Sequence, residues 1–221
     1  MKFKAIIFDM DGTITDTEPL WHQATYAVIT NRGHSLTLEE KEHLKHQLTG
    51  LGLPRSCQII KEFINTPDSI EIIMKEKAAI ASTLYETGIC FIDGFPEFIQ
   101  RVMSLSLKRA VATNATIDTL EQTDKSLNLS QYFGTHLYSF NHVNNIGKPN
   151  PTLFLYAAQK LGVHPRECIV IEDSSHGIMA AQAAGMFCIG INTSKRKIQI
   201  KDADLIVENY SAIDLNTLLD R

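Results

Sequence analysis

The chain has 221 residues, enough for one large domain or for a main domain with an insertion, and its 44% apolar and 21% charged residues exclude wholesale disorder. The net charge of -4 provides no electrostatic basis for binding nucleic acid. Because the first apolar run, Ala5 to Phe8, is too short for a signal peptide or a membrane span, we expect a cytoplasmic protein that engages no membrane, and we take it to be a monomer.

The first strand is expected at residues 4–8, where an apolar run ends at Asp9. Side chains two residues apart share one face of a strand, so Asp9 and Asp11 can approach one ligand if the extended conformation continues that far. Gly12 then allows the chain to turn. Asp-Gly alone is a common turn, but the complete string from Ile6 to Thr13 is far more specific.

Residues 17–87 form a block that is predicted to be helical throughout. The expected helices span residues 18–31, 37–48, 54–64 and 68–86, with glycines and prolines at the breaks. A helical block directly after the first strand predicts a small separate lobe that could close over a ligand at the end of that strand. We therefore divide the chain into a core of residues 1–16 and 88–221 and a helical cap of residues 17–87.

Short strands alternate with helices in the rest of the chain. The strands are expected at residues 109–112, 136–140, 168–171, 187–191 and 203–207, and the helices at residues 95–106, 115–127, 150–161, 174–184 and 211–219. This alternation predicts an α/β fold, a doubly wound Rossmann-like parallel sheet with an inserted α-helical cap domain. Function is then expected where the carboxyl ends of the strands meet the loops.

A second acidic pair, Glu172-Asp173, follows the strand at 168–171 and precedes a helix. By itself such a pair complements the helix dipole, an effect worth about 0.3–1 kcal/mol. Both acidic pairs, however, stand at the carboxyl end of a strand in one parallel sheet. If the two strands are neighbours, four carboxylates converge, and a hard divalent ion, most simply Mg²⁺, relieves their repulsion.

Three further residues are candidates for contacts with a phosphate group. Lys148 lies in a loop that its neighbours Gly147 and Pro149 restrict. Thr113 and Asn114 end the strand at 109–112, where they can cap the next helix. Alternatively, the hydroxyl of Thr113 and nearby backbone N–H groups hold phosphate oxygens at a helix N-terminus.

Taken together, these motifs resemble the haloacid dehalogenase superfamily, in the phosphatase branch with a helical cap of the β-phosphoglucomutase type. The resemblance covers essentially the whole chain. Its signatures stand in the expected order as Asp9-x-Asp11-Gly12-Thr13, Thr113, Lys148 and Glu172-Asp173.

The resemblance implies an enzyme, a phosphoric monoester hydrolase, in which Asp9 attacks phosphorus and Asp11 protonates the leaving alcohol and then activates water. It also implies Mg²⁺ held by Asp9, the backbone carbonyl of Asp11 and Asp173, with Glu172 nearby or acting through water. Lys148 and Thr113 would screen and orient the phosphate oxygens. The substrate would be a small phosphate monoester, and the acid at Asp11 favours phosphate transfer over the dehalogenase and phosphonate-cleaving reactions.

Two alternatives stay open at this point. A sugar phosphate mutase of the β-phosphoglucomutase type has a histidine on the first cap helix, where this chain has Trp21 with His22 one residue later. One residue rotates a helical side chain by about 100°, so His22 does not simply replace it. A signalling switch with a phosphorylated aspartate is the other alternative, although such receivers resemble only the core.

Two cap residues are candidates for substrate recognition. The string Asp16-Thr-Glu-Pro-Leu-Trp21 resembles bacterial sugar phosphate phosphatases that act on sugar or hexitol phosphates. Residues 49–55 resemble the cap loop that reaches the substrate in these relatives. We expect Arg55 to contact substrate oxygens and Trp21 to pack against sugar carbons; alternatively, Arg55 is an exposed cation at a helix start and Trp21 is part of the cap core.

Overall fold

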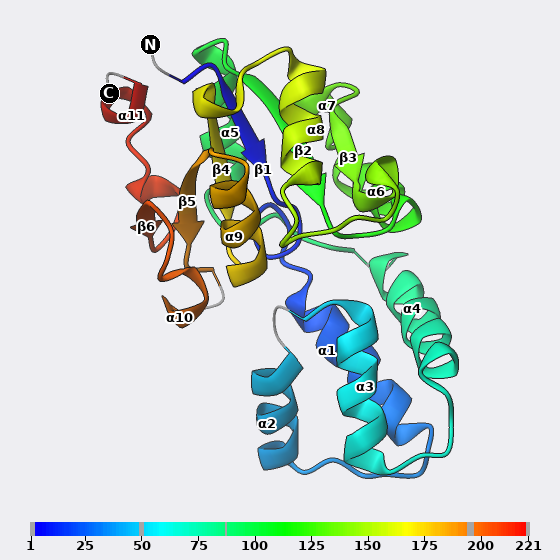
Figure 1. The fold of residues 1–221 in the computed structure, drawn as a ribbon. Helices are drawn as coiled ribbons and strands as arrows, with labels where there is room; N and C mark the ends of the chain where they lie inside the picture. Colours follow the sequence, from blue (N-terminus) through cyan, green and yellow to red (C-terminus); the bar gives the residue numbers. More distant parts are fainter. Residues whose placement is uncertain (1–2, 49–50, 87, 194–196, 220–221) are drawn as a thin grey trace. The chain divides into compact units, whose positions relative to one another are not determined.

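The computed structural model describes residues 3–48, 51–86, 88–193 and 197–219. The contacts within the chain divide it into two compact units. One contains Met1–Asp16 with Cys90–Arg221, and the other contains Thr17–Ile89 (Figure 1). The second unit thus begins at the residue where the sequence suggests a cap and ends two residues beyond the expected boundary at residue 87.

The first unit is built on a six-stranded sheet in which every neighbouring pair of strands is parallel. The strands are β1 (Ala5–Phe8), β2 (Lys108–Thr113), β3 (Leu137–Ser139), β4 (Cys168–Glu172), β5 (Phe187–Ile191) and β6 (Leu205–Val207). Their order in space is β3-β2-β1-β4-β5-β6. The chain therefore winds outward from β1 in one direction and from β4 in the other, which confirms the predicted doubly wound α/β fold.

Helices lie between these strands and after the last one. They are α5 (Phe95–Ser104), α6 (Ile117–Leu127), α7 (Ser130–Phe133), α8 (Thr152–Leu161), α9 (Ser175–Ala183), α10 (Lys197–Ile200) and α11 (Leu215–Leu219), with short 3-10 helices η1 (Phe140–Val143), η2 (Pro165–Glu167) and η3 (Tyr210–Ala212). The helix expected at 211–219 is wrong as one element, because the carboxylate of Asp214 accepts the backbone N–H groups of Asn216 and Thr217 and begins α11 separately.

The strand expected at 203–207 is two residues shorter in the structure. The backbone N–H of Ala203 donates to the carbonyl of Ile200 at 3.1 Å, which closes a turn instead of extending the strand. The carboxylate of Asp204 accepts the backbone N–H of Cys188 at 2.8 Å. Strand pairing therefore begins only at Leu205.

Both faces of the sheet are buried, and residues that alternate along β1 serve the two sides. Ile6 and Phe8 belong to the apolar cluster that contains α5, whereas Ala5 and Ile7 belong to the cluster that contains α8 and α9 (Figure 1). Burying a large apolar side chain contributes about 1.5–3 kcal/mol, so a strand with two buried faces favours an unbroken apolar run. This burial fixes β1 at the centre of the sheet, and Asp9 follows at its carboxyl end.

The second unit consists of helices α1 (Glu18–Thr30), α2 (Leu38–Leu48), α3 (Leu53–Ile64) and α4 (Ile70–Glu86). It has its own apolar core. In α3, Cys57, Ile60 and Ile64 recur at helical spacing and are buried against residues of the other helices. The unit can therefore hold its own shape through packing among its helices.

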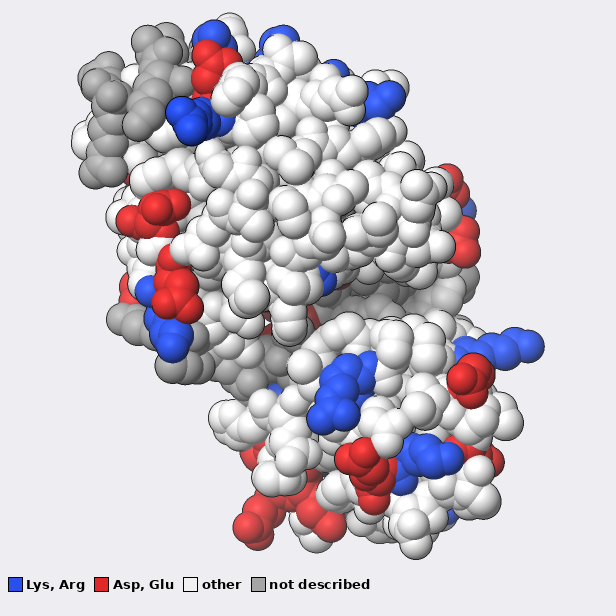
Figure 2. Space-filling model, viewed as in Figure 1, with Lys and Arg blue, Asp and Glu red and all other residues white. Residues whose placement is uncertain are grey.

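The surface shows charges of both signs. On the face drawn in Figure 2, the Lys and Arg side chains among the described residues are interspersed with Asp and Glu. Mixed charges of this kind create no extended field of one sign on that face. None of the helices in the described part of the chain has the length and apolar character needed to span a membrane.

Candidate active site

The polar residues singled out in the sequence lie at the carboxyl ends of three neighbouring strands. β1 stands between β2 and β4 and is parallel to both. Pairing continues beyond β1, since the backbone N–H of Asp9 donates to the carbonyl of Ile171 at 3.0 Å. Thr113 ends β2, and Glu172 ends β4 with Asp173 directly after it. These residues therefore meet where the winding of the sheet reverses, the usual ligand position in such folds.

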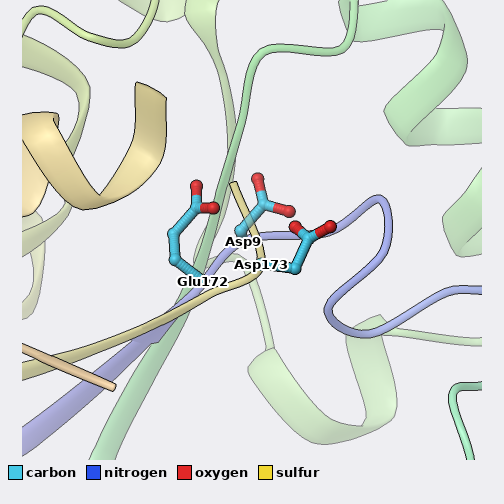
Figure 3. A group of neighbouring side chains, drawn as sticks. All are labelled: Asp9, Glu172 and Asp173. Carbon is cyan, nitrogen blue, oxygen red and sulfur yellow. The ribbon is translucent and has the colours of Figure 1, made fainter. Parts of the chain in front are cut away.

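Three carboxylates gather at this edge of the sheet. Asp9, Glu172 and Asp173 each offer an oxygen atom, and these atoms lie within 4.8 Å of one another (Figure 3). Glu172 is fully buried, Asp9 is nearly so, and Asp173 is half-buried. Asp11, the fourth expected acid, does not belong to this group and lies half-buried in the turn after β1.

Lys148 is the cation that the chain itself supplies to these acids. Its ammonium group donates to Asp9 Oδ1 at 2.5 Å and to Glu172 Oε1 at 2.7 Å, and its side chain is buried. Burial lowers the pKa of Lys148, but the charges of Asp9 and Glu172 outweigh burial and hold the pKa above its ordinary value. Burial raises the pKa of Asp9, against the opposing effect of Lys148.

The charges of this group do not balance. With every acid ionised, three carboxylates and one ammonium leave a net charge of -2. Uncompensated charge in a buried site is unfavourable, and like charges at this range oppose ionisation. A divalent cation would bring the sum to zero, and carboxylate oxygens are the ligands that Mg²⁺ prefers. Both the donor atoms and the excess charge therefore fit Mg²⁺.

Glu172 is held by the protein on both of its oxygens. Lys148 donates to Oε1, and the backbone N–H and the hydroxyl of Ser174 both donate to Oε2 at 2.9 Å, just before α9. Gly177 leaves the space for this carboxylate, because a Cβ there would lie 1.6 Å from Glu172 Oε1. The sequence reading missed Gly177; its only signal is a glycine near a helix start, where alanine is intrinsically better.

The turn after β1 packs directly against Asp173. Gly12 has a φ of +86°, and a Cβ there would lie 2.3 Å from Asp173 Oδ2. The hydroxyl of Thr13 donates to Asp173 Oδ1 at 3.3 Å. Gly12 is therefore required both for its left-handed backbone and for the close approach of an acid.

The side chain of Asn114 holds the loop that carries Lys148. Its Oδ1 accepts the backbone N–H of Lys148 at 2.8 Å, and its Nδ2 donates to the carbonyl of Lys148 at 3.3 Å. A Cβ at Gly147 would lie 2.8 Å from the same Oδ1. Neither Thr113 nor Asn114 caps the next helix, since Thr116 does so with its own hydroxyl. The amide of Asn114 thus orients Lys148, while a substrate contact for Asn114 stays a prediction.

Trp21 and Arg55 belong to the helical unit, and their contact with a substrate also stays a prediction. Trp21 lies half-buried on α1, and Arg55 is exposed in the first turn of α3. Arg55 lines an open hollow between α2 and α3 together with His43 and Gln47. Residues 49 and 50, the start of the predicted substrate loop, lie outside the described residues.

The sequence reading also missed Lys77 on α4. This side chain is buried, donates to the hydroxyl of Ser56 at 3.0 Å, and lies 5.8 Å from the centroid of the Trp21 ring. The signal was present, because Lys77 stands four residues after Ile73 and four before Ala81 on the buried stripe of the helix.

The fold and this arrangement of acids are those of a class of proteins built on a doubly wound parallel sheet with acidic residues directly after its first and fourth strands. A comparison with protein families supports that class directly: residues 6–191 match the model of the haloacid dehalogenase-like hydrolases. The chain belongs to this family, and it is an enzyme of the hydrolase class.

Individual relatives are similar over most of the chain. The fructose-1-phosphate phosphatase YqaB of Escherichia coli is 33% identical over 86% of this chain and 97% of its own length. The phosphorylated carbohydrates phosphatase of Thermotoga maritima is 32% identical over 83% of this chain and 82% of its own. The SUPPRESSOR OF QUENCHING 1 protein of Arabidopsis thaliana is 33% identical over 99% of this chain, which spans only 21% of that protein.

Solved structures show the same fold. A family IA, variant 3 hydrolase of Entamoeba histolytica has a TM-score of 0.82 and 26% identity, covering 99% of this chain and 98% of its own. A putative β-phosphoglucomutase of Thermotoga maritima has a TM-score of 0.76 and 26% identity, covering 99% of both chains.

Proposed function

We propose that this chain is a Mg²⁺-dependent phosphatase that hydrolyses a small phosphate monoester, a sugar or polyol phosphate, through a phosphorylated Asp9. The observation that carries the proposal is the meeting of Asp9, Asp173 and Lys148 at one edge of the sheet. A nucleophilic carboxylate can approach a phosphate dianion only where cationic groups offset the repulsion. The phosphatases among the relatives support the same reaction class.

In the first step a carboxylate oxygen of Asp9 attacks phosphorus, and the bond from phosphorus to the ester oxygen breaks. Asp11 donates its proton to the departing alkoxide, which leaves as an alcohol. In the second step Asp11 takes a proton from water as the water oxygen attacks phosphorus, so the bond to Asp9 breaks and phosphate is released. Asp11 lies half-buried in the turn directly after Asp9, and its charge contributes to raising the pKa of Asp9, which supports this division of roles.

Three groups of the chain assist these steps. Lys148 neutralises the nucleophile before attack and then faces the phosphate oxygens, and the Asn114 amide fixes its loop. Thr113 is buried at the end of β2, where its hydroxyl can donate to a phosphate oxygen. Asp9, Asp173 and the carbonyl of Asp11 would hold Mg²⁺, with Glu172 nearby. When bound, the ion supplies positive charge that lowers the barrier to attack on the phosphate group.

Two residues of the helical unit, together with the relatives, support the proposed substrate class. Arg55 is a cation in the first turn of α3, where the helix dipole disfavours positive charge by about 0.3–1 kcal/mol. Such a cation does little for the helix, which supports a role in binding substrate oxygens. Trp21 offers a half-buried ring against which sugar carbons can pack. The carbohydrate phosphatase and the fructose-1-phosphate phosphatase among the relatives agree with this assignment.

A mutase is the second candidate, favoured by the likeness to a putative β-phosphoglucomutase. That reaction would need a group on the first cap helix to assist proton transfer. His22 is the nearest histidine in sequence, but it is buried and its ring stacks on Tyr26 with centroids 6.4 Å apart. This packing supports hydrolysis over isomerisation.

The test is a panel of hexose, polyol and glycolate phosphates with Mg²⁺, in which free phosphate and rearranged sugar are both measured. The wild-type chain should release phosphate, and Asp9→Asn should reduce the rate to background. Asp118→Asn, an exposed acid on α6, is the matched control and should retain full activity. Rearranged sugar without phosphate release would establish the mutase, and a stable phosphoprotein after acetyl phosphate treatment would establish the signalling switch.

A further inference from the structure

The C-terminal segment returns to the turn after β1, beyond the residues that match the family model. Tyr210 opens η3 and is completely buried, and its hydroxyl donates to the backbone carbonyl of Thr13 at 2.9 Å. The hydroxyl of Thr193, after β5, donates to the carbonyl of Gly12 at 2.6 Å. Two successive carbonyls of the turn are thus held by side chains more than 180 residues away in sequence.

The backbone hydrogen bonds within the turn do not use the carbonyls of Gly12 and Thr13, which can therefore accept from side chains elsewhere in the unit. The carbonyl of Met10 accepts the backbone N–H groups of Ile14 and Thr15, and the N–H of Gly12 donates to the carbonyl of Thr15. These bonds close the turn on itself. The carbonyls of Gly12 and Thr13 point out of the turn and accept hydrogen bonds from the hydroxyls of Thr193 and Tyr210. These two bonds fix the orientation of the turn relative to the rest of the unit.

The residue that Tyr210 holds is also the one that contacts Asp173. The hydroxyl of Thr13 donates to Asp173 Oδ1 at 3.3 Å, so a displacement of the Thr13 backbone moves a hydrogen-bond donor of that acid. Burial raises the pKa of Tyr210 well above its ordinary value, and the charges of Asp9 and Asp173 raise it further. Tyr210 therefore keeps its proton and remains a donor.

The ring of Tyr210 does not need its hydroxyl in order to pack. It lies against Phe98 and Phe95 with ring centroids 4.9 and 5.6 Å apart. A phenylalanine would fill the same place in this aromatic cluster. A buried hydroxyl is unfavourable unless it is bonded, so its contribution lies in the bond to Thr13.

We infer that Tyr210 is a positioning residue of the proposed active site: through Thr13 it fixes the turn against Asp173 and so sets the place of the acids that would hold Mg²⁺. This inference rests on the proposed function. The motif residues of the site all lie at or before Asp173, so the inference adds a residue from the C-terminal segment to the site.

The test is Tyr210→Phe in the full chain, compared with Tyr138→Phe. Tyr138 on β3 is also buried, and its hydroxyl pairs with His136 Nδ1 at 2.8 Å. Tyr138→Phe therefore removes the same hydroxyl group, but from a strand that does not carry the carboxylates. We expect Tyr210→Phe to weaken Mg²⁺ binding, measured by calorimetry, by about 10-fold or more and to lower kcat with little change in KM. Tyr138→Phe should alter neither quantity.

A double-mutant cycle with Thr13→Val tests whether Tyr210 acts on Asp173 through Thr13. If Tyr210 acts through the Thr13 hydroxyl, Tyr210→Phe should weaken Mg²⁺ binding much less in the Thr13→Val background than in the wild type. Equal losses in both backgrounds, or a lower melting temperature with unchanged Mg²⁺ affinity and kcat, would overturn the inference. A wild-type chain that binds Mg²⁺ but hydrolyses no phosphate monoester would overturn the proposed function alone, because the calorimetric comparison would still decide the role of Tyr210. A wild-type chain that binds no Mg²⁺ would overturn both.

Discussion

Replacing Lys77 by methionine is expected to stabilise the helical unit. The amine of Lys77 is buried and its hydrogen bond is to the hydroxyl of Ser56, with no carboxylate facing it in an ion pair among the described residues. Methionine has nearly the same length and shape, so it can fill the space without the charge. Ser56 would keep a partner, because its hydroxyl also donates to the carbonyl of Leu53 at 2.9 Å.

The size of this stabilisation follows from the pKa of Lys77. Burial lowers the pKa of Lys77 from 10.5 to about 8, although the neighbouring Cys57 thiol acts in the opposite direction. Because each tenfold change in proton affinity is worth about 1.4 kcal/mol, keeping this amine charged costs about 3 kcal/mol at pH 7. Lys77→Met should therefore raise the free energy of unfolding of the helical unit by up to about 3 kcal/mol.

The assay is urea-induced unfolding followed by the fluorescence of Trp21. It is the single tryptophan of the chain, and it lies in the helical unit near Lys77, so the signal reports on that unit. Lys75→Met is the matched control, since Lys75 is exposed on the same helix. Its effect on stability should lie within about 0.5 kcal/mol of zero.

The structure also predicts how the free energy of unfolding of the helical unit changes with pH. Between pH 8 and 10.5 the unfolded chain binds more protons at Lys77 than the folded chain does, so the stability of the wild type should rise with pH across this window. The gain in the free energy of unfolding of Lys77→Met over the wild type should accordingly be largest below pH 8 and decrease toward pH 10.5. A variant that unfolds at lower urea than the wild type at pH 7 would refute the reasoning.

Three further predictions concern the acidic site. Gly177→Ala should lower kcat by about 10-fold or more in steady-state kinetics, because the new Cβ would lie 1.6 Å from Glu172 Oε1 and would displace the carboxylate that holds Lys148; an unchanged kcat would contradict this. Asn114→Ala should lower kcat by about 10-fold in steady-state kinetics, since Lys148 loses both amide contacts to its backbone. Phosphate release should stop in EDTA and return when Mg²⁺ is added in excess, because the carboxylate group carries uncompensated charge; turnover that persists in EDTA would exclude the metal.

The sequence predicted those features of the fold that depend on local patterns. The strand at 187–191 has the predicted bounds, and the first strand ends at Phe8 as expected, because doubly buried strands are short apolar runs with sharp ends. The acidic pairs could be placed at strand ends for the same reason. Their proximity depended on β1 and β4 being neighbours, which no local pattern reveals and which only the strand order establishes.

Particular side-chain contacts could not be predicted from the sequence. The space at Gly177 for the nearby Glu172, and the bond from Tyr210 to the distant Thr13, leave no pattern along the chain that would indicate them. Lys77 differs from these, because a lysine on the apolar stripe of a predicted helix can be recognised from the sequence. The division of the C-terminal segment at Asp214 could also be predicted from the sequence, since aspartate is one of the preferred residues at a helix N-cap.

The structure further separates the roles of the two acids that end β4. Both oxygens of Glu172 accept hydrogen bonds from Lys148 and Ser174, so the protein itself holds this carboxylate in place. The other two carboxylates, Asp9 and Asp173, are then the direct ligands that we expect, and Mg²⁺ in proteins is usually held by one or two carboxylates. Asp173→Asn should then weaken Mg²⁺ binding more than Glu172→Gln does, whereas Glu172→Gln should act mainly on kcat by loosening Lys148. Calorimetry and steady-state kinetics on both variants measure the difference, and a larger loss of Mg²⁺ affinity in Glu172→Gln would show instead that Glu172 is the stronger ligand.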